Sequence, residues 1–250
     1  MTRYGIIKTK QPEHPPRSLL VVPHKKKPLI VSRFGPNTLK NNEAEMQKIY
    51  SHPQTGEPIT FRPATTSESI SAVVYNFAEI AKPEIFDPGW LQAGRIIGTP
   101  ELGVFTNTRE TNPDNLRLLL DNARKVNGIY IVSDTIALAP YESFQRGVQE
   151  FGDFAVNPRT NGLARALEYS KGKKATNFAK IAGEENYNLG VNVRYFDPTS
   201  EPVERVAGLY SYRDADCDRL GVDGDGWDDD DGGYAFGVLN FVAEGDAPKR

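Results

Sequence analysis

Residues 206–241 read VAGLYSYRDADCDRLGVDGDGWDDDDGGYAFGVLNF, and their composition sets them apart from the rest of the chain. Nine of the sixteen aspartates lie between Asp214 and Asp231. The stretch has no Lys, Glu, Gln or Met. These four types make up about one residue in six of the whole chain, so chance would leave such a gap on the order of two times in a thousand. A solvated acidic surface would mix Glu with Asp, so the pattern indicates a restriction on the residue types of this segment.

The chain has 250 residues, of which 38% are hydrophobic and 25% charged, and these values predict a globular protein with one large domain or two small ones. The net charge of −3 is unevenly distributed. Nine Asp and two Arg give residues 206–241 a charge of −7, which leaves +4 for the remainder. An acidic surface repels phosphate groups, so nucleic acid is not expected as its ligand.

The sequence contains no apolar run close to the roughly 20 residues that span a bilayer, so no membrane span is predicted. Residues 1–16 lack the apolar core of a signal peptide, and a cytoplasmic location is the default expectation. Cys217 is the only cysteine, which excludes an internal disulfide.

Helical and strand patterns follow one another irregularly along the chain, which predicts an α+β fold. Strands are predicted at residues 19–22, 29–32, 59–61, 96–97, 102–106, 129–132, 191–195, 202–210 and 234–242. Helices are predicted at residues 39–50, 113–127, 140–151, 161–171 and 176–182, with a further one after a capping box formed by Thr65 and Glu68. Residues 1–58 are interpreted as an N-terminal arm with a small β/α lead-in, and residues 59–250 as one domain.

The aspartate cluster has a metal-binding interpretation. The first, third, fifth and twelfth places of an EF-hand-like loop are occupied by Asp214, Asp216, Asp218 and Asp225. The sixth place needs Gly for its sharp turn but holds Arg219, and the flanking segments are predicted strands rather than helices. An irregular site for calcium or another divalent cation, lined by these aspartates, stays open as an alternative.

A catalytic interpretation is less favoured. The run Asp228 to Asp231 is poorly suited to separating the pKa values of an acid and a base. The three histidines, His14, His24 and His52, all lie in Pro-rich turns near the N-terminus, and no phosphate-binding or zinc-binding motif is present. We therefore predict no enzymatic activity.

A binding surface is the favoured interpretation. Tyr, Ser, Gly and Asp displayed on a rigid scaffold are typical of recognition surfaces, because Tyr offers contact area with few rotatable bonds and Asp offers charge complementarity. The framework residues between them would attach the segment to the core, and these are Arg219, Leu220, Val222, Trp227 and Phe236. A disordered acidic loop would offer Trp227 nothing to pack against.

With this framework, the segment resembles the variable region of target proteins of diversity-generating retroelements. In that family a reverse transcriptase, error-prone at template adenines, rewrites Asn codons, which can become Asp, Tyr, Ser, Gly, Ala or Cys but not Lys, Glu, Gln, Met or Trp. The string DRLGVDGDGWDDDDGGYAFGVLNF, residues 218–241, is similar to such a rewritten template with the family's closing strand. Two blocks predicted to be helical, residues 130–147 and 163–167, are also similar to archaeal members.

The resemblance implies a C-type-lectin-like domain, related in shape to the formylglycine-generating enzyme, with a variable region at about residues 206–241. It implies a hypervariable ligand-binding protein without cofactor, apart from the calcium alternative, and with a macromolecular ligand, most simply a protein. Carried over position by position, the variable ligand-binding sites are Tyr210, Ser211, Tyr212, Asp214, Ala215, Asp216, Cys217, Gly221, Asp223, Asp225, Asp228, Asp229, Asp230 and Asp231.

Overall fold

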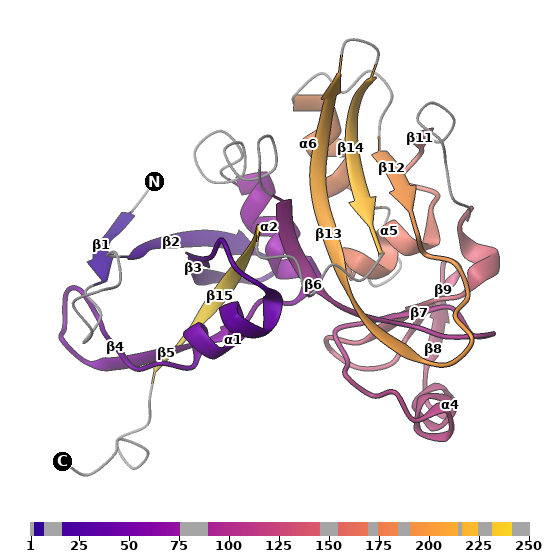
Figure 1. Ribbon diagram of the computed structural model, residues 1–250, viewed down its shortest axis with the longest axis horizontal. Coiled ribbons are helices and arrows are strands. Elements are labelled where there is room, and N and C mark those ends of the chain that lie inside the picture. The colour runs from indigo at the N-terminus through magenta and orange to yellow at the C-terminus, as the bar shows by residue number, and fades with distance from the viewer. Residues whose placement is uncertain are drawn as a thin grey trace.

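The computed structural model describes residues 3–7, 17–75, 90–145, 155–169, 175–184, 191–214, 217–224 and 232–241. They form a mixed α+β fold, which confirms the predicted class, with one long curled sheet at its centre (Figure 1). The main path of the sheet runs, in spatial order, through β1 (Arg3–Ile7), β2 (Arg17–His24), β3 (Lys27–Phe34), β15 (Gly233–Phe241), β6 (Trp90–Gly98), β13 (Val203–Asp214), β14 (Cys217–Asp223), β12 (Val191–Arg194) and β11 (Ala155–Val156).

Strand β15, near the C-terminus, joins the N-terminal strands β1 to β3 to the rest of the sheet. One of its edges pairs with β3, where Ala235 lies opposite Phe34. Its other edge pairs in parallel with the start of β6, and then with β5 (Pro58–Pro63), where Leu239 lies opposite Phe61. The strands of residues 17–34 and 58–63 therefore share one sheet with the closing strand. The short β4 (Tyr50–Ser51) pairs antiparallel with β5.

A smaller branch of strands leaves the sheet at β6. In pairing order it comprises β7 (Val104–Thr106), β10 (Ala137–Ala139), β9 (Ile129–Ile131) and β8 (Arg124–Val126). The β8–β9 hairpin turns at Asn127 and Gly128, whose φ angles of 48° and 85° lie in the left-handed region. Such a pair of residues suits the tight turn that links two antiparallel strands.

Five α-helices are described: α1 (Leu39–Met46), α2 (Thr66–Tyr75), α4 (Pro113–Asp121), α5 (Gly162–Leu167) and α6 (Asn177–Glu184). Side chains cap the N-termini of α1, α2, α4 and α5. The Thr65 amide donates to Glu68 Oε2 at 2.8 Å and the Glu68 amide donates to Thr65 Oγ1 at 3.3 Å, which confirms the predicted capping box. Asn112 caps α4 and Asn161 caps α5 in the same way.

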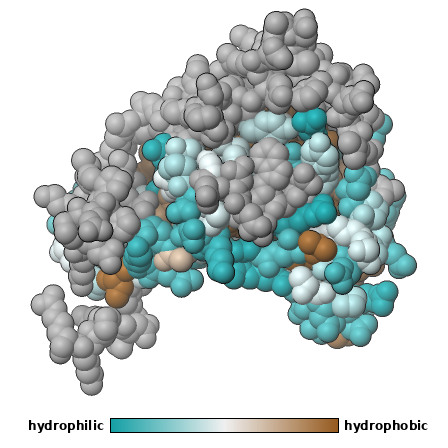
Figure 2. Space-filling model, in the orientation of Figure 1, coloured by the Kyte–Doolittle hydropathy of each residue, from teal (hydrophilic) through white to brown (hydrophobic). Residues whose placement is uncertain are grey.

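The helices cover both faces of the sheet. The main core lies between the sheet and helices α2, α5 and α6. Helix α1 covers the opposite face near β15 and closes a second core around the ring contacts of Phe34, Tyr50 and Phe61, whose centroids are 5.2–6.4 Å apart. Helix α4 packs Leu116 against the branch sheet in a third core. The described surface on the face shown in Figure 2 is mainly hydrophilic.

Four predicted helices differ from the structure. The helix expected at 161–171 ends at Leu167 in α5. The helix expected at 39–50 ends at Met46, and Tyr50 begins strand β4. The helix expected to continue to Gly128 ends at Asp121, because the following residues form the β8–β9 hairpin. The helix expected at 140–151, and with it the helical block 130–147, is wrong for its described part.

Residues 130–147 contain β9, β10 and a short 3₁₀ helix, η2 (Tyr141–Ser143), after which Phe144 is extended with φ −149° and ψ 155°. Tyr141 and Phe144 are nevertheless both buried. The Tyr141 hydroxyl donates to the Thr99 carbonyl at 2.5 Å, so a tertiary contact holds this turn. Apolar spacing alone cannot distinguish such a buried turn from a helix.

Candidate functional site

The first candidate site is the β13–β14 hairpin, which contains most of the described part of residues 206–241. Its two strands pair antiparallel from Gly208 opposite Asp223 to Asp214 opposite Cys217. The predicted strand at 202–210 therefore extends four residues further. Strand β12 pairs in parallel with β14 on its other edge (Figure 1). The two strands predicted to flank the aspartate cluster correspond to β13 and β15, whereas β14 lies inside the cluster and was not predicted.

Apolar residues attach this hairpin to the main core. Leu209, Leu220 and Val222 are each at most 3% exposed, and Leu209 lies directly opposite Val222. Phe236 on β15 belongs to the same core. Burying an aliphatic side chain of this size stabilises the fold by roughly 1.5–3 kcal/mol, so Leu209, Leu220 and Val222 hold the hairpin against the core.

Tyr210 lies half-buried on the face of the sheet that α1 covers, packed against the second core. Its hydroxyl accepts a hydrogen bond from Arg194 Nη1 at 3.1 Å. Its ring lies over Gly221, the residue opposite it, so closely that a Cβ atom on Gly221 would come within 2.5 Å of Tyr210 Cζ. Any side chain at position 221 would therefore compete for space with the ring of Tyr210, and both are predicted variable positions.

Asp223 is buried, with only 2% of its surface exposed, and it lies opposite Arg194 of β12. Burial lowers the pKa of Arg194, but the hydrogen bond with Tyr210 and the nearby charges, including Asp223, outweigh this effect and raise that pKa. Asp223 thus acts on a scaffold cation beneath the surface rather than lying on the exposed surface as the sequence led us to expect.

Two arginines outside the acidic segment contribute to this site, and sequence reasoning missed both. Arg194 contacts Tyr210, as described above. Arg205 Nη1 lies 3.3 Å from the Gly224 carbonyl oxygen and 3.4 Å from that of Tyr195, so it links the ends of β14 and β12. No local pattern marked either residue, because the parallel pairing of β12 with β14 is known only from the structure.

The other predicted site residues are described only in part. The structure gives the backbone positions of Ser211, Tyr212, Asp214, Cys217, Asp218 and Arg219. Outside the described residues lie Ala215, Asp216, Asp225, Trp227, Asp228, Asp229, Asp230 and Asp231. Within the described part of the chain, no group of three or more His, Cys, Asp or Glu side chains could hold a metal ion. The cation alternative includes Asp216 and Asp225, so it stays a prediction.

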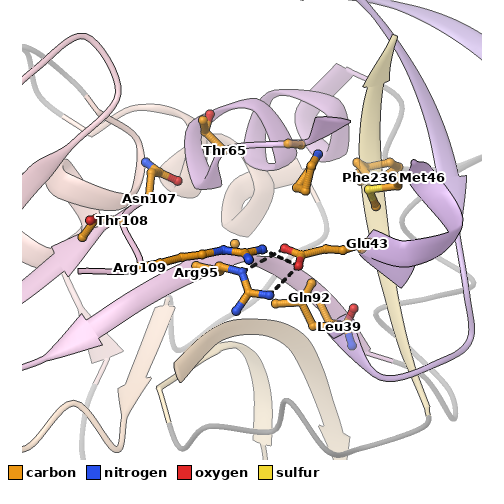
Figure 3. A pocket seen from close by; sticks show the side chains of 14 residues that line it. Leu39, Glu43, Met46, Thr65, Gln92, Arg95, Asn107, Thr108, Arg109 and Phe236 are labelled. Carbon is orange, nitrogen blue, oxygen red and sulfur yellow. Dashed lines mark hydrogen bonds and ion pairs between the residues drawn. The ribbon is translucent and has the colours of Figure 1, made fainter. Parts of the chain in front are cut away.

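The second candidate site is a pocket of about 370 Å³ beside α1, drawn in Figure 3. Its walls come from α1, the β5–α2 connection, β6, the start of β15 and the loop after β7. The lining residues are Leu39, Glu43, Met46, Pro63, Ala64, Thr65, Gln92, Gly94, Arg95, Asn107, Thr108, Arg109, Ala235 and Phe236.

An ion-pair network crosses this pocket. Arg95 Nε donates to Glu43 Oε1 at 2.8 Å, and Arg95 Nη2 donates to Glu43 Oε2 at 2.5 Å. Arg109 Nη2 donates to the same Oε2 at 2.5 Å, as Figure 3 shows. Arg95 also pairs with Glu204 of β13. The network therefore ties α1, β6, β13 and the loop after β7 together.

Comparison of the chain with protein-family models, with curated proteins and with solved structures finds no match. Among the described residues, no helix has both the length and the apolar character to cross a membrane.

Proposed function

We propose that this chain is a hypervariable, non-enzymatic ligand-binding protein of the kind that diversity-generating retroelements rewrite, built on a C-type-lectin-like domain. The observation that carries the proposal is the division of residue types along β13 and β14. Buried Leu209, Leu220 and Val222 alternate with Tyr210 and Gly221. Tyr and Gly are residue types that a rewritten Asn codon can give, while the three aliphatic residues belong to the core.

This division gives the protein a way to change its ligand without losing its fold. The ladder of backbone hydrogen bonds does not depend on which side chains a strand carries, apart from proline. The buried aliphatic residues supply the attachment to the core. Substitution at the remaining positions would then alter recognition while the backbone stays in place.

The expected partner is a protein surface that is basic or rich in hydrogen-bond donors. Residues 206–241 carry a charge of −7, and opposite charges accelerate association and select against wrong partners. Tyr210 offers a ring whose hydroxyl is already oriented by Arg194 at 3.1 Å, so little side-chain entropy is lost on binding. Because these positions vary, the individual ligand would differ from copy to copy.

The gene's own neighbourhood gives the deciding test. We expect a reverse-transcriptase gene nearby, and a near-copy of codons 206–241 with Asn codons at the variable sites. Copies sequenced from one population should differ at those sites and agree at Leu220, Val222 and Phe236. If neither the reverse transcriptase nor the near-copy is present, or if substitutions fall equally on the three apolar positions, the proposal is wrong.

A further inference from the structure

The pocket beside α1 has the size and walls of a small-molecule site. Its volume of about 370 Å³ lies within the range of roughly 300–1,000 Å³ that is usual for such sites. Leu39, Met46, Ala235 and Phe236 give it apolar walls. A ligand that fits these walls needs an apolar body, and its polar end must match the charged network.

Three of the roughly four acceptor sites of the Glu43 carboxylate are already used. Its Oε1 accepts from Arg95 Nε, and its Oε2 accepts from both Arg95 and Arg109. The carboxylate is 8% exposed, so the two guanidinium groups replace its water. A donor group on a ligand would have to displace one of these charge-assisted hydrogen bonds, which are stronger than neutral ones.

Arg109 is in the opposite situation. A guanidinium group carries five N–H donors in a fixed planar fork, and within the described residues Arg109 uses one of them, on Glu43. Its side chain is 61% exposed, while that of Arg95 is 18% exposed and bound to two carboxylates. Within the described residues Arg109 therefore has four donors left, against two for the less exposed Arg95, and the ligand group that matches its fork is a planar acceptor such as a carboxylate.

We propose that this pocket binds a small carboxylate with an apolar body, held by the guanidinium of Arg109 and by the apolar walls. The network adds no net charge to the site, because Glu43 and Glu204 balance Arg95 and Arg109. Binding thus depends on directed hydrogen bonds more than on a positive field, and it includes an apolar contribution. None of the predicted variable ligand-binding sites lines this pocket, so the site does not depend on the proposed function.

Titration of the full chain with phenylacetate, phenylacetamide and acetate, followed by isothermal calorimetry, tests this site. Phenylacetate combines the carboxylate with an apolar ring, phenylacetamide lacks the negative charge, and acetate lacks the ring. We expect saturable binding of phenylacetate at one site, with phenylacetamide and acetate each at least about tenfold weaker. No binding of phenylacetate, or equal binding of the amide, would overturn the proposal.

Matched arginine variants locate the binding. Arg109→Gln should weaken phenylacetate binding at least about tenfold, and Arg109→Lys should give an intermediate loss because a lysine keeps the charge without the fork. The control is Arg117→Gln on α4, an arginine of the same exposure, 62%, that lies outside the pocket lining. The affinity of the Arg117→Gln variant for phenylacetate should stay within twofold of that of the parent chain. Equal losses for Arg109→Gln and Arg117→Gln, or no loss for Arg109→Gln, would place binding elsewhere and refute the assignment.

Discussion

Replacing Gly221 with alanine tests the packing of the β13–β14 hairpin. The new Cβ would lie 2.5, 2.7 and 2.8 Å from three ring carbons of Tyr210, closer than side chains pack. The ring would have to move away from the 3.1 Å hydrogen bond with Arg194. Overpacking of this kind costs about 1–3 kcal/mol, whereas alanine in a strand is otherwise more stable than glycine by about 0.5–1 kcal/mol. We expect a net loss of about 1–2 kcal/mol in the free energy of unfolding.

The same substitution should change sign when Tyr210 is removed. In a Tyr210→Ala background the clash disappears, and Gly221→Ala should stabilise the protein by about 0.5–1 kcal/mol. Urea denaturation of the parent, both single variants and the double variant gives the coupling, for which we expect about 1–3 kcal/mol. Gly98→Ala is the control, because its Cβ would meet Thr199 Cγ2 at an ordinary 3.4 Å. If the effects at 210 and 221 add within about 0.5 kcal/mol, the packing argument is refuted.

Three further predictions concern the scaffold. Glu43→Ala should lower the free energy of unfolding by about 2–4 kcal/mol, because it leaves the largely buried Arg95 with one carboxylate fewer. Arg109→Gln changes an exposed side chain and should cost less than about 1 kcal/mol, and similar losses for the two variants would contradict this prediction. Burial opposes the ionisation of Glu68, but hydrogen bonds from Arg62 and Thr65 outweigh this effect and lower the pKa of Glu68 below 4.5. The Arg62→Met variant should therefore be less stable than the parent, with the full difference in the free energy of unfolding above pH 4.5. This difference should shrink as the pH falls through the lowered pKa of Glu68. If the difference in stability between the parent and Arg62→Met does not change with pH, its link to the ionisation of Glu68 is excluded. Millimolar calcium should leave the melting temperature unchanged, and an upward shift would instead favour the cation site at residues 214–225.

The parts of the fold that local chemistry determines were predictable from the sequence. The Thr65–Glu68 capping box and the cap at Asn112 involve residues a few positions apart, and both form as expected. The network around Glu43 was not predictable, because Glu43 lies 52 residues from Arg95 and 66 from Arg109, on different elements. Likewise, burial of Tyr141 by its contact with Thr99 overrode the helical spacing after Pro140.

The same distinction explains why the acidic segment could be interpreted only in part. Its apolar residues were predicted to pack into the core, and Leu220, Val222 and Phe236 are buried. The pairing of β12 with β14 could not be inferred, because parallel neighbours need no sequence signal at the contact. That pairing is what brings Arg194 next to Tyr210 and Asp223. The burial of Tyr210 and Asp223 therefore depends on β12, whose place beside β14 cannot be predicted from residues 206–241.

The sheet should also limit how freely the hairpin can vary. Residues 220–223 lie between β13 and β12, so a substitution there meets neighbours on both sides. Within the described ladders, residues 212–214 and 217–219 pair only with each other, and a two-stranded ribbon imposes fewer cross-strand contacts. If this segment is rewritten from copy to copy, the variable sites among residues 211–217 should hold a wider range of residue types than Gly221 and Asp223. Sequencing many copies measures that range directly, and equal diversity at both sets would mean that the packing around Tyr210 and Arg194 does not constrain the surface.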